Sequence, residues 1–302
     1  MKAPLPPAWL DQAAYPFESH YFDAPSGDRL HYVDEGPEDA PALVFVHGTP
    51  SWSFEYRDLV KGLRGRYRCL ALDALGFGLS DKPRDADYTP AAQGRRLEAW
   101  LDRLGLDGVT LVVHDFGGPF GLSWALRHPE RVGRLVLMNT WLWRTDDDPA
   151  ARRFGKLLAG PVGRFLYLDL NFSPRVLLKK GFVNRTYWSK TLHAHYLKPF
   201  PRRDDRRGLL GTARALVGAS AWYALRWTEI GRLAEVPTLL LWGTRDPFFG
   251  PDALARWQAA LPRARTVELD CGHFPAEERP AEVLSALEDW LAADGQARRR
   301  RG

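Results

Sequence analysis

Short apolar runs recur along the first half of the chain, separated by turn residues or by helix-like patterns. Five of these runs fit strands, at His20–Asp23, Arg29–Val33, Leu43–Val46, Cys69–Leu72 and Thr110–His114. The first two flank Ser26-Gly27 and predict a hairpin, while Phe54–Leu63 and Ala91–Leu104 fit helices. Strand–helix alternation of this kind is typical of a mostly parallel sheet with helices on both faces.

The alternation stops after a further strand at Leu135–Met138. From about Trp141 to Trp227 the pattern is helical and interrupted by prolines and glycines, with segments at Arg152–Leu168, Pro174–Lys180, Tyr187–Leu197 and Arg207–Val217. Strands return at Thr238–Leu241 and Thr266–Leu269, before a last helix at Ala281–Ala292. We therefore predict a core made of residues 1–140 and 228–302, with residues 141–227 inserted as a helical cap that shapes a pocket and excludes water from it.

Composition narrows the class of partner. Four of the charges behind the net +5 lie in the terminal run Arg298–Arg301, which is expected to be solvated and disordered, so the rest of the chain is close to neutral and nucleic-acid binding is not expected. Cys69 and Cys271 belong to no metal-ligand pattern, and we predict neither a metal site nor a disulfide framework. The N-terminal residues have no signal-peptide core and no run is long enough to span a membrane, which favours a cytoplasmic protein without a membrane partner.

The most informative segment is Leu111–Gly118, in which a buried strand runs into a helix that opens with two glycines. This arrangement predicts a nucleophile elbow, a strained turn that holds one side chain clear of the sheet. The residue at the break is Asp115, followed two positions later by Gly117 and preceded by Val113, where such elbows often have glycine. A carboxylate suits attack on a saturated carbon, which gives an alkyl ester that water then cleaves. Taken alone, Asp115 fits equally well as a helix N-cap.

Two later segments favour the nucleophile. The strand that ends at Leu269 is followed by a loop containing His273, and the strand before it is followed by Asp246. Nucleophile, acid and histidine, each just past a strand, occur in the order that a hydrolytic triad of this kind requires. The alternative position for the acid, after Met138, holds Asn139 and Thr140, so Asp246 takes the role.

A pocket for developing negative charge is predicted at Val46–Pro50, where another buried strand ends. The backbone N–H groups of Thr49 and Phe116 are expected to converge on the reacting oxygen. Pro50 is expected to lie in a fixed turn, cis or trans.

These residues, together with the segments His47–Arg57, Leu72–Pro83 and Gly272–Phe274, resemble the haloalkane dehalogenase branch of the α/β-hydrolase superfamily. The likeness extends over about residues 20 to 292. It implies the α/β-hydrolase fold, with a mostly parallel sheet, helices on both faces and an inserted cap. It also implies cleavage of carbon–halogen bonds by Asp115, with His273 activating water, Asp246 supporting it, and no cofactor or metal.

The chain departs from this family where the halide is held. Haloalkane dehalogenases place a tryptophan directly after the nucleophile and, in many members, an asparagine beside the oxyanion position, whereas this chain has Phe116 and Thr49. The indole N–H of another tryptophan could replace the missing halide donor, and the candidates are Trp52, Trp141, Trp143 and Trp188.

Two alternatives remain open at this stage. The same scaffold also makes epoxide hydrolases, whose acid is usually a pair of cap tyrosines, and Tyr167, Tyr187 and Tyr196 are the candidates here. A catalytically silent ligand-binding scaffold is the other alternative. The expected partners are a small hydrophobic substrate and water, and the chain is expected to be a monomer or a homodimer.

Overall fold

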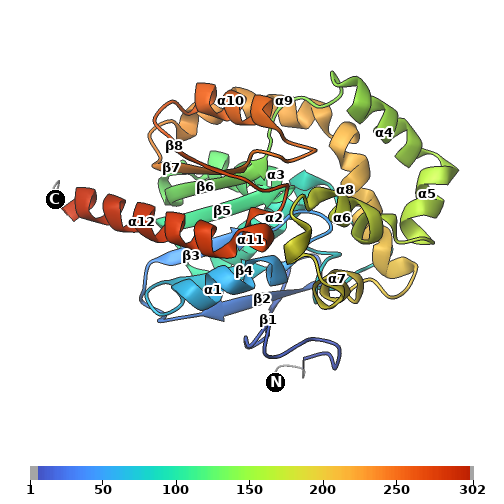
Figure 1. Ribbon diagram of the computed structural model, residues 1–302, viewed down its shortest axis with the longest axis horizontal. Coiled ribbons are helices and arrows are strands. Elements are labelled where there is room, and N and C mark those ends of the chain that lie inside the picture. The colour runs from blue at the N-terminus through green and yellow to red at the C-terminus, as the bar shows by residue number, and fades with distance from the viewer. Residues whose placement is uncertain (1–5, 300–302) are drawn as a thin grey trace.

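The computed structural model describes residues 6–299 and contains one eight-stranded sheet (Figure 1). Its strands are β1 (His20–Asp23), β2 (Arg29–Glu35), β3 (Ala42–Val46), β4 (Arg68–Leu72), β5 (Val109–Asp115), β6 (Val132–Thr140), β7 (Thr238–Gly243) and β8 (Arg265–Leu269). They lie in the order β1-β2-β4-β3-β5-β6-β7-β8. β1 and β2 form the expected antiparallel hairpin, β2 is antiparallel to β4, and the strands from β4 to β8 are parallel.

The helices cover both faces of this sheet, and their bounds are α1 (Arg57–Leu63), α2 (Pro90–Leu104), α3 (Gly117–Arg127), α4 (Pro149–Ala159), α5 (Pro161–Leu168), α6 (Leu178–Gly181), α7 (Lys190–Leu197), α8 (Arg207–Gly218), α9 (Ser220–Thr228), α10 (Pro251–Ala260), α11 (Pro275–Glu278) and α12 (Pro280–Arg299). Helices α4 to α9, called the cap helices, fall between β6 and β7 in the chain. Helices α4 to α8 lie together beyond one end of the strands (Figure 1), while α9 contacts α3 of the core. The division into separate core and cap domains stays a prediction.

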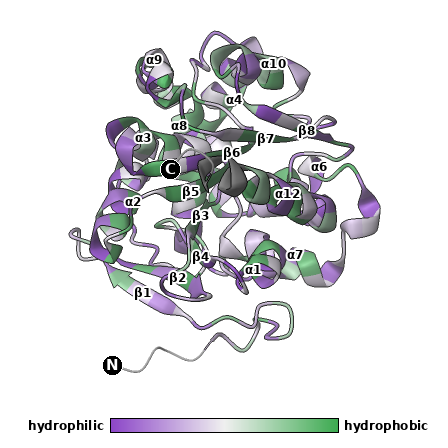
Figure 2. Cartoon of the chain, turned by 90° about the vertical axis from the view of Figure 1, so that its left-hand side faces the viewer, coloured by the Kyte–Doolittle hydropathy of each residue, from purple (hydrophilic) through white to green (hydrophobic). Residues whose placement is uncertain are grey.

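Successive residues of each central strand point to opposite faces of the sheet, and both faces are apolar. In β5, for example, Leu111 and Val113 pack with side chains of α2 and α3, while Val112 packs with those of α1 and α12. Figure 2 shows the hydrophobic colour concentrated on these central strands. Because the parallel strands are sandwiched in this way, their carboxyl ends meet at one edge, and the loops that carry chemistry meet there too.

Several predicted helices differ in extent. The segment Arg152–Leu168 is two helices, since Gly160 and Pro161 end α4 and start α5, and Pro161 provides no N–H for a continuing helix. The segment Phe54–Leu63 begins with a short 3₁₀ turn before α1, and Tyr187–Leu197 becomes helical only at Lys190, after its cap Ser189. The helix α10 was not predicted.

The last helix is also longer than expected. It runs through Arg299 instead of ending at Ala292, because Gly295 alone does not outweigh the helix-forming alanines, glutamine and arginines around it. Arg300 and Arg301 of the predicted disordered tail lie outside the described residues. No helix within residues 6–299 is long and apolar enough to cross a membrane.

Candidate active site

The turn after β5 holds Asp115 in a strained conformation. Its φ of 50° lies in the left-handed region, which a residue with a side chain rarely adopts. The turn is tight because glycines follow: a Cβ on Gly117 would lie 1.9 Å from the carbonyl oxygen of Val46, and one on Gly118 would lie 1.8 Å from Oγ1 of Thr140. The predicted elbow geometry is therefore present, and strain of this kind is typical of functional turns.

The alternative interpretation of Asp115 as a helix cap is wrong. Helix α3 begins after Phe116 and has no side-chain cap hydrogen bond. The Asp115 carboxylate instead accepts a hydrogen bond from the Thr49 N–H at Oδ1 (2.8 Å). Its other oxygen, Oδ2, lies 3.4 Å from Nε2 of His273. The peptide bond between Thr49 and Pro50 is cis.

Asp246 and His273 complete a connected row with Asp115. The Nδ1 atom of His273 lies 2.8 Å from Oδ2 of Asp246, whose other oxygen accepts from the Phe248 N–H (2.7 Å). All three side chains are buried, with 2% to 6% of their surface exposed. The three residues singled out from the order of the strands are thus brought together.

The neighbouring carboxylates shift the pKa of His273, and His273 in turn shifts the pKa of Asp246. Burial by itself lowers the pKa of His273, but the carboxylates of Asp246 and Asp115 outweigh it and raise that pKa to about 10. Burial likewise raises the pKa of Asp246, yet the neighbouring His273 outweighs it and the net direction is downward. The imidazole of the free protein therefore carries a proton at neutral pH.

Asn139 is a site residue that the sequence analysis passed over because it is not acidic. Its Nδ2 donates to Oδ2 of Asp246 (2.8 Å) and to the carbonyl of Gly243 (3.0 Å), and its Oδ1 accepts from the Gly243 N–H (2.8 Å). The residue is fully buried at the end of β6. It therefore ties β6 to β7 and fixes the carboxylate that orients His273. Its place at the end of a central strand is the feature of the sequence that could have indicated a role in the site.

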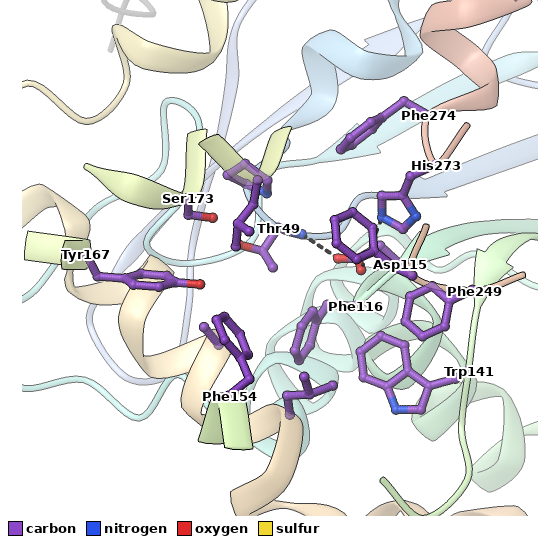
Figure 3. A pocket seen from close by; sticks show the side chains of 15 residues that line it. Thr49, Asp115, Phe116, Trp141, Phe154, Tyr167, Ser173, Phe249, His273 and Phe274 are labelled. Atoms are coloured by element: carbon purple, nitrogen blue, oxygen red, sulfur yellow. Dashed lines mark hydrogen bonds and ion pairs between the residues drawn. The ribbon is translucent and has the colours of Figure 1, made fainter. Parts of the chain in front are cut away.

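A pocket opens over Asp115 between the sheet edge and the cap helices (Figure 3). Besides Asp115, Thr49 and His273, its walls are mostly apolar and are formed by Pro50, Phe116, Trp141, Phe154, Leu177, Ala213, Leu216, Phe248, Phe249 and Phe274. Tyr167 and Ser173 supply hydroxyl groups on the cap side. Such a pocket suits a small, largely hydrophobic molecule.

Of the four predicted indole donors, Trp141 alone lines this pocket. Trp52 does not line it: its N–H donates to the carbonyl of His195 (3.0 Å) and its ring stacks on Phe54. Trp141 does line it, stacked on Phe249 at 4.9 Å, but its indole nitrogen points away from Asp115 (Figure 3). Trp143 and Trp188 lie outside the pocket wall.

Two of the predicted cap tyrosines are also elsewhere. Tyr196 is buried outside the pocket, where its hydroxyl donates to Glu277, and Tyr187 is 39% exposed to solvent. Tyr167 of α5 is the cap tyrosine that lines the pocket, with its hydroxyl directed into it beside Ser173 (Figure 3). Burial keeps this phenol protonated by raising its pKa, and the hydrogen bond with Ser173 acts in the opposite direction.

Among the described residues no group of three or more His, Cys, Asp or Glu is arranged to hold a metal ion. Cys69 and Cys271 are buried free thiols. The polar groups around Asp115 are its own carboxylate, the imidazole of His273 and the backbone N–H of Thr49, at the carboxyl ends of the parallel strands.

Comparison with known proteins agrees with this geometry. Residues 41–280 match the family model described as the alpha/beta hydrolase fold, so the chain belongs to that family. Haloalkane dehalogenase 2 of Mycobacterium tuberculosis is 36% identical over 280 residues, which cover 92% of this chain and 96% of that protein. The crystal structure of a haloalkane dehalogenase from Bradyrhizobium elkani USDA94 superposes with a TM-score of 0.84 at 27% identity, covering 93% of this chain and 99% of that one.

Within the family the chain is a haloalkane-dehalogenase-like hydrolase, which sets aside the catalytically silent alternative. Relatives with another name are nearly as similar. The cis-3-alkyl-4-alkyloxetan-2-one decarboxylase of Shewanella oneidensis is 34% identical, with 91% of this chain and 89% of that protein covered.

Proposed function

We propose that the chain hydrolyses carbon–halogen bonds of small haloalkanes through an alkyl ester on Asp115. The observation that carries this proposal is the position of the Asp115 carboxylate, which is held by the Thr49 N–H on one oxygen, lies beside His273 on the other, and faces an apolar pocket. The family relatives that bear the name haloalkane dehalogenase support it. The proposed partners are the substrate and water, without a cofactor.

In the first step one carboxylate oxygen of Asp115 attacks the carbon that bears the halogen. The new C–O bond forms as the carbon–halogen bond breaks, and the halide leaves with the bonding pair. No proton is needed in this step. The apolar wall around Asp115 strengthens the attack because it leaves the carboxylate with few competing hydrogen bonds.

The second step needs a base. Once Asp115 is esterified its negative charge is gone, and with it part of the attraction that raises the pKa of His273. His273 then releases its proton to solvent, and the neutral imidazole takes a proton from water as the resulting hydroxide attacks the ester carbonyl carbon. The backbone N–H of Thr49, and that of Phe116 at the start of α3, receive the negative charge on the carbonyl oxygen. Cleavage of the C–O bond between the acyl carbon and the alkoxyl oxygen then releases the alkoxide, which takes the proton held by His273 and leaves as the alcohol. The carboxylic acid left on Asp115 passes its proton back to His273, which restores the Asp115 carboxylate.

Stoichiometric halide release from a panel of chloro- and bromoalkanes tests this function. We expect Asp115→Ala to lower the rate by about 10³-fold or more, because it removes the nucleophile itself. The exposed residue Asp252 of α10 provides the control, since Asp252→Ala leaves the pocket intact. Halide release that survives in Asp115→Ala would show that another group performs the chemistry.

A second candidate is the opening of a strained oxygen ring, and the hydroxyl of Tyr167 favours it. A halide leaves as an anion, but a ring oxygen becomes an alkoxide that needs a proton, and a buried phenol is a suitable donor. The chain has Phe116 directly after Asp115, and the indole nitrogen of the adjacent Trp141 points away from Asp115 (Figure 3), which favours the same candidate. The name of the Shewanella oneidensis relative also refers to a four-membered oxygen ring.

The two candidates are separated by comparing Tyr167→Phe with Tyr223→Phe. Both are buried cap tyrosines, but the Tyr223 hydroxyl donates to the carbonyl of Ala215 (3.0 Å) outside the pocket. If an oxygen ring is the substrate, Tyr167→Phe lowers diol formation from an epoxide by about 10²-fold or more while Tyr223→Phe does not. If the wild-type chain releases halide but forms no diol, the cleavage of carbon–halogen bonds is the candidate that remains.

A further inference from the structure

A buried carboxylate–imidazole pair lies directly behind the catalytic row and takes no part in the two steps described above. Glu55 and His114 are both inaccessible to solvent, and Oε1 of Glu55 lies 2.7 Å from Nδ1 of His114. His114 immediately precedes Asp115 in β5, yet its side chain lines no part of the pocket. Its other ring nitrogen, Nε2, lies 2.6 Å from the backbone carbonyl oxygen of His273.

The neighbours of His114 show which of its ring nitrogens is the donor to His273. A carbonyl oxygen only accepts, so the Nε2 atom that faces His273 carries a proton. Burial alone would raise the pKa of Glu55, but the neighbouring His114, together with Ser51 and His47, outweighs burial and lowers it. The Nε2–H of His114 therefore donates to the carbonyl of His273, while Glu55 faces the opposite ring nitrogen.

This bond is one of two that hold the His273 peptide. On the other side, the His273 N–H donates to the carbonyl of Gly181 in the cap helix α6 (2.8 Å). The rings of His114 and His273 also lie against each other, with centroids 4.7 Å apart. The backbone of the catalytic histidine is thus fixed from the sheet by His114 and from the cap by Gly181.

We infer that His114 is a positioning residue for His273, oriented in turn by Glu55, and that it acts on the hydrolysis of the ester and not on its formation. The inference rests on the proposed function. His273 is needed as a base only in the second step, so a displaced His273 backbone slows that step alone. Misplacement of a catalytic group by about 1 Å costs on the order of 10²-fold in rate.

The chain contains a matched control for stability effects. His31 and Asp73 form a second buried imidazole–carboxylate pair, 2.9 Å apart and equally inaccessible to solvent. The other ring nitrogen of His31 contacts Ser19 (3.1 Å), and within residues 6–299 neither His31 nor Asp73 forms a hydrogen bond or ion pair with His273. Breaking either pair is expected to lower stability to a similar degree, since each leaves a buried carboxylate without its imidazole partner.

The test compares His114→Asn, His114→Gln and His31→Asn in the full-length chain. An asparagine amide takes the place of Nδ1 and loses the donor to the His273 carbonyl, whereas a glutamine amide reaches the place of Nε2 and retains it. Rapid mixing with a bromoalkane, followed by mass spectrometry of the Asp115 peptide, gives the rates of ester formation and decay separately. We expect ester decay in His114→Asn to be slower by on the order of 10²-fold, with ester formation within about twofold of wild type.

We expect His114→Gln to restore most of the decay rate and His31→Asn to leave both rates unchanged at a temperature where all variants are folded. Equal slowing of both steps in His114→Asn, or failure of His114→Gln to recover the decay rate, overturns the inference and leaves His114 with a structural role.

Should His114→Asn be unfolded, unchanged kinetics in Glu55→Ala would count against the inference and selectively slowed ester decay would support it. If His273→Phe itself traps no ester, the proposed function fails, and that result is independent of His114.

Discussion

Replacing His273 by phenylalanine is expected to trap part of the substrate covalently on the chain. The variant keeps Asp115, the Thr49 N–H that orients it, and the apolar pocket, so the first step proceeds. It lacks the base that activates water, so the ester persists and steady turnover falls by about 10³-fold or more. Mass spectrometry of the intact chain after exposure to 1-bromobutane measures the result as an added butyl group.

Digestion then locates the added mass on the peptide that contains Asp115. The matched control is the double variant Asp115→Ala/His273→Phe, which retains the same pocket substitution but has no nucleophile and is expected to stay unmodified. A wild-type chain that releases bromide, combined with a His273→Phe variant that never gains mass, contradicts the covalent mechanism and favours direct attack by water.

The residues of the catalytic row could be predicted from the sequence because their positions depend on strand order and not on fine packing. Asp115, Asp246 and His273 each follow a strand of a parallel sheet, and the carboxyl ends of such strands share one edge. The apolar runs that mark the strands are continuous, since both faces of the sheet are buried, and this made them easy to recognise.

The cap residues could not be predicted in the same way. Helical periodicity predicts that Tyr167 and Tyr196 lie on helices but does not tell which face of each helix meets the pocket. That depends on how the cap helices rotate and pack, which placed Tyr167 in the pocket wall and Tyr196 against Glu277. Trp52 does not serve as a donor in the pocket for a related reason. Its indole N–H donates instead to the carbonyl of His195, a residue 143 positions away in the chain.

Asn139 shows a different limit of the sequence analysis. The end of β6 offers no carboxylate, so the sequence assigns the acid to the loop after β7 and predicts no role for Asn139. In the structure both strand ends contribute, because the amide of Asn139 donates to the acid supplied by the loop after β7. A supporting role of this kind becomes visible only when the two loops are placed side by side.

Replacing Asp246 by asparagine is expected to reduce ester hydrolysis on the order of 10⁴-fold, the scale found when the acid of a comparable triad becomes an amide. The reason lies in the partners of Asp246, which are all donors: Nδ1 of His273 and Nδ2 of Asn139 at one oxygen, and the Phe248 N–H at the other. An amide must present its own NH₂ group to at least one of them. The imidazole then loses either its orientation or the tautomer in which Nε2 accepts the proton of water.

The same substitution is expected to change the pH dependence of stability. In the wild-type chain the pKa of His273 is raised to about 10, against an ordinary value of about 6.5. The stabilisation from its charged form is therefore fully present below about pH 6.5 and is lost as the pH rises through about 10. Asp246→Asn removes the main attraction, so the free energy of unfolding is lowered most in the range where wild-type His273 is still charged. Denaturant unfolding at intervals between pH 6 and pH 10 measures this difference, with Asp252→Asn on the exposed side of α10 as the control.

Both effects of Asp246→Asn have one physical source, which makes them a joint test of the row. If the carboxylate orients and charges His273, the loss of hydrolysis and the loss of stability occur together, and ester formation on Asp115 persists because its own contact with the Thr49 N–H is untouched. A variant that hydrolyses the ester at the wild-type rate, or whose His273 titrates by NMR at an unchanged pH, would remove Asp246 from the role that its 2.8 Å contact with Nδ1 indicates. The acid would then have to act at a distance, and no other carboxylate except Asp115 lies in ion-pair contact with the His273 ring within the described residues.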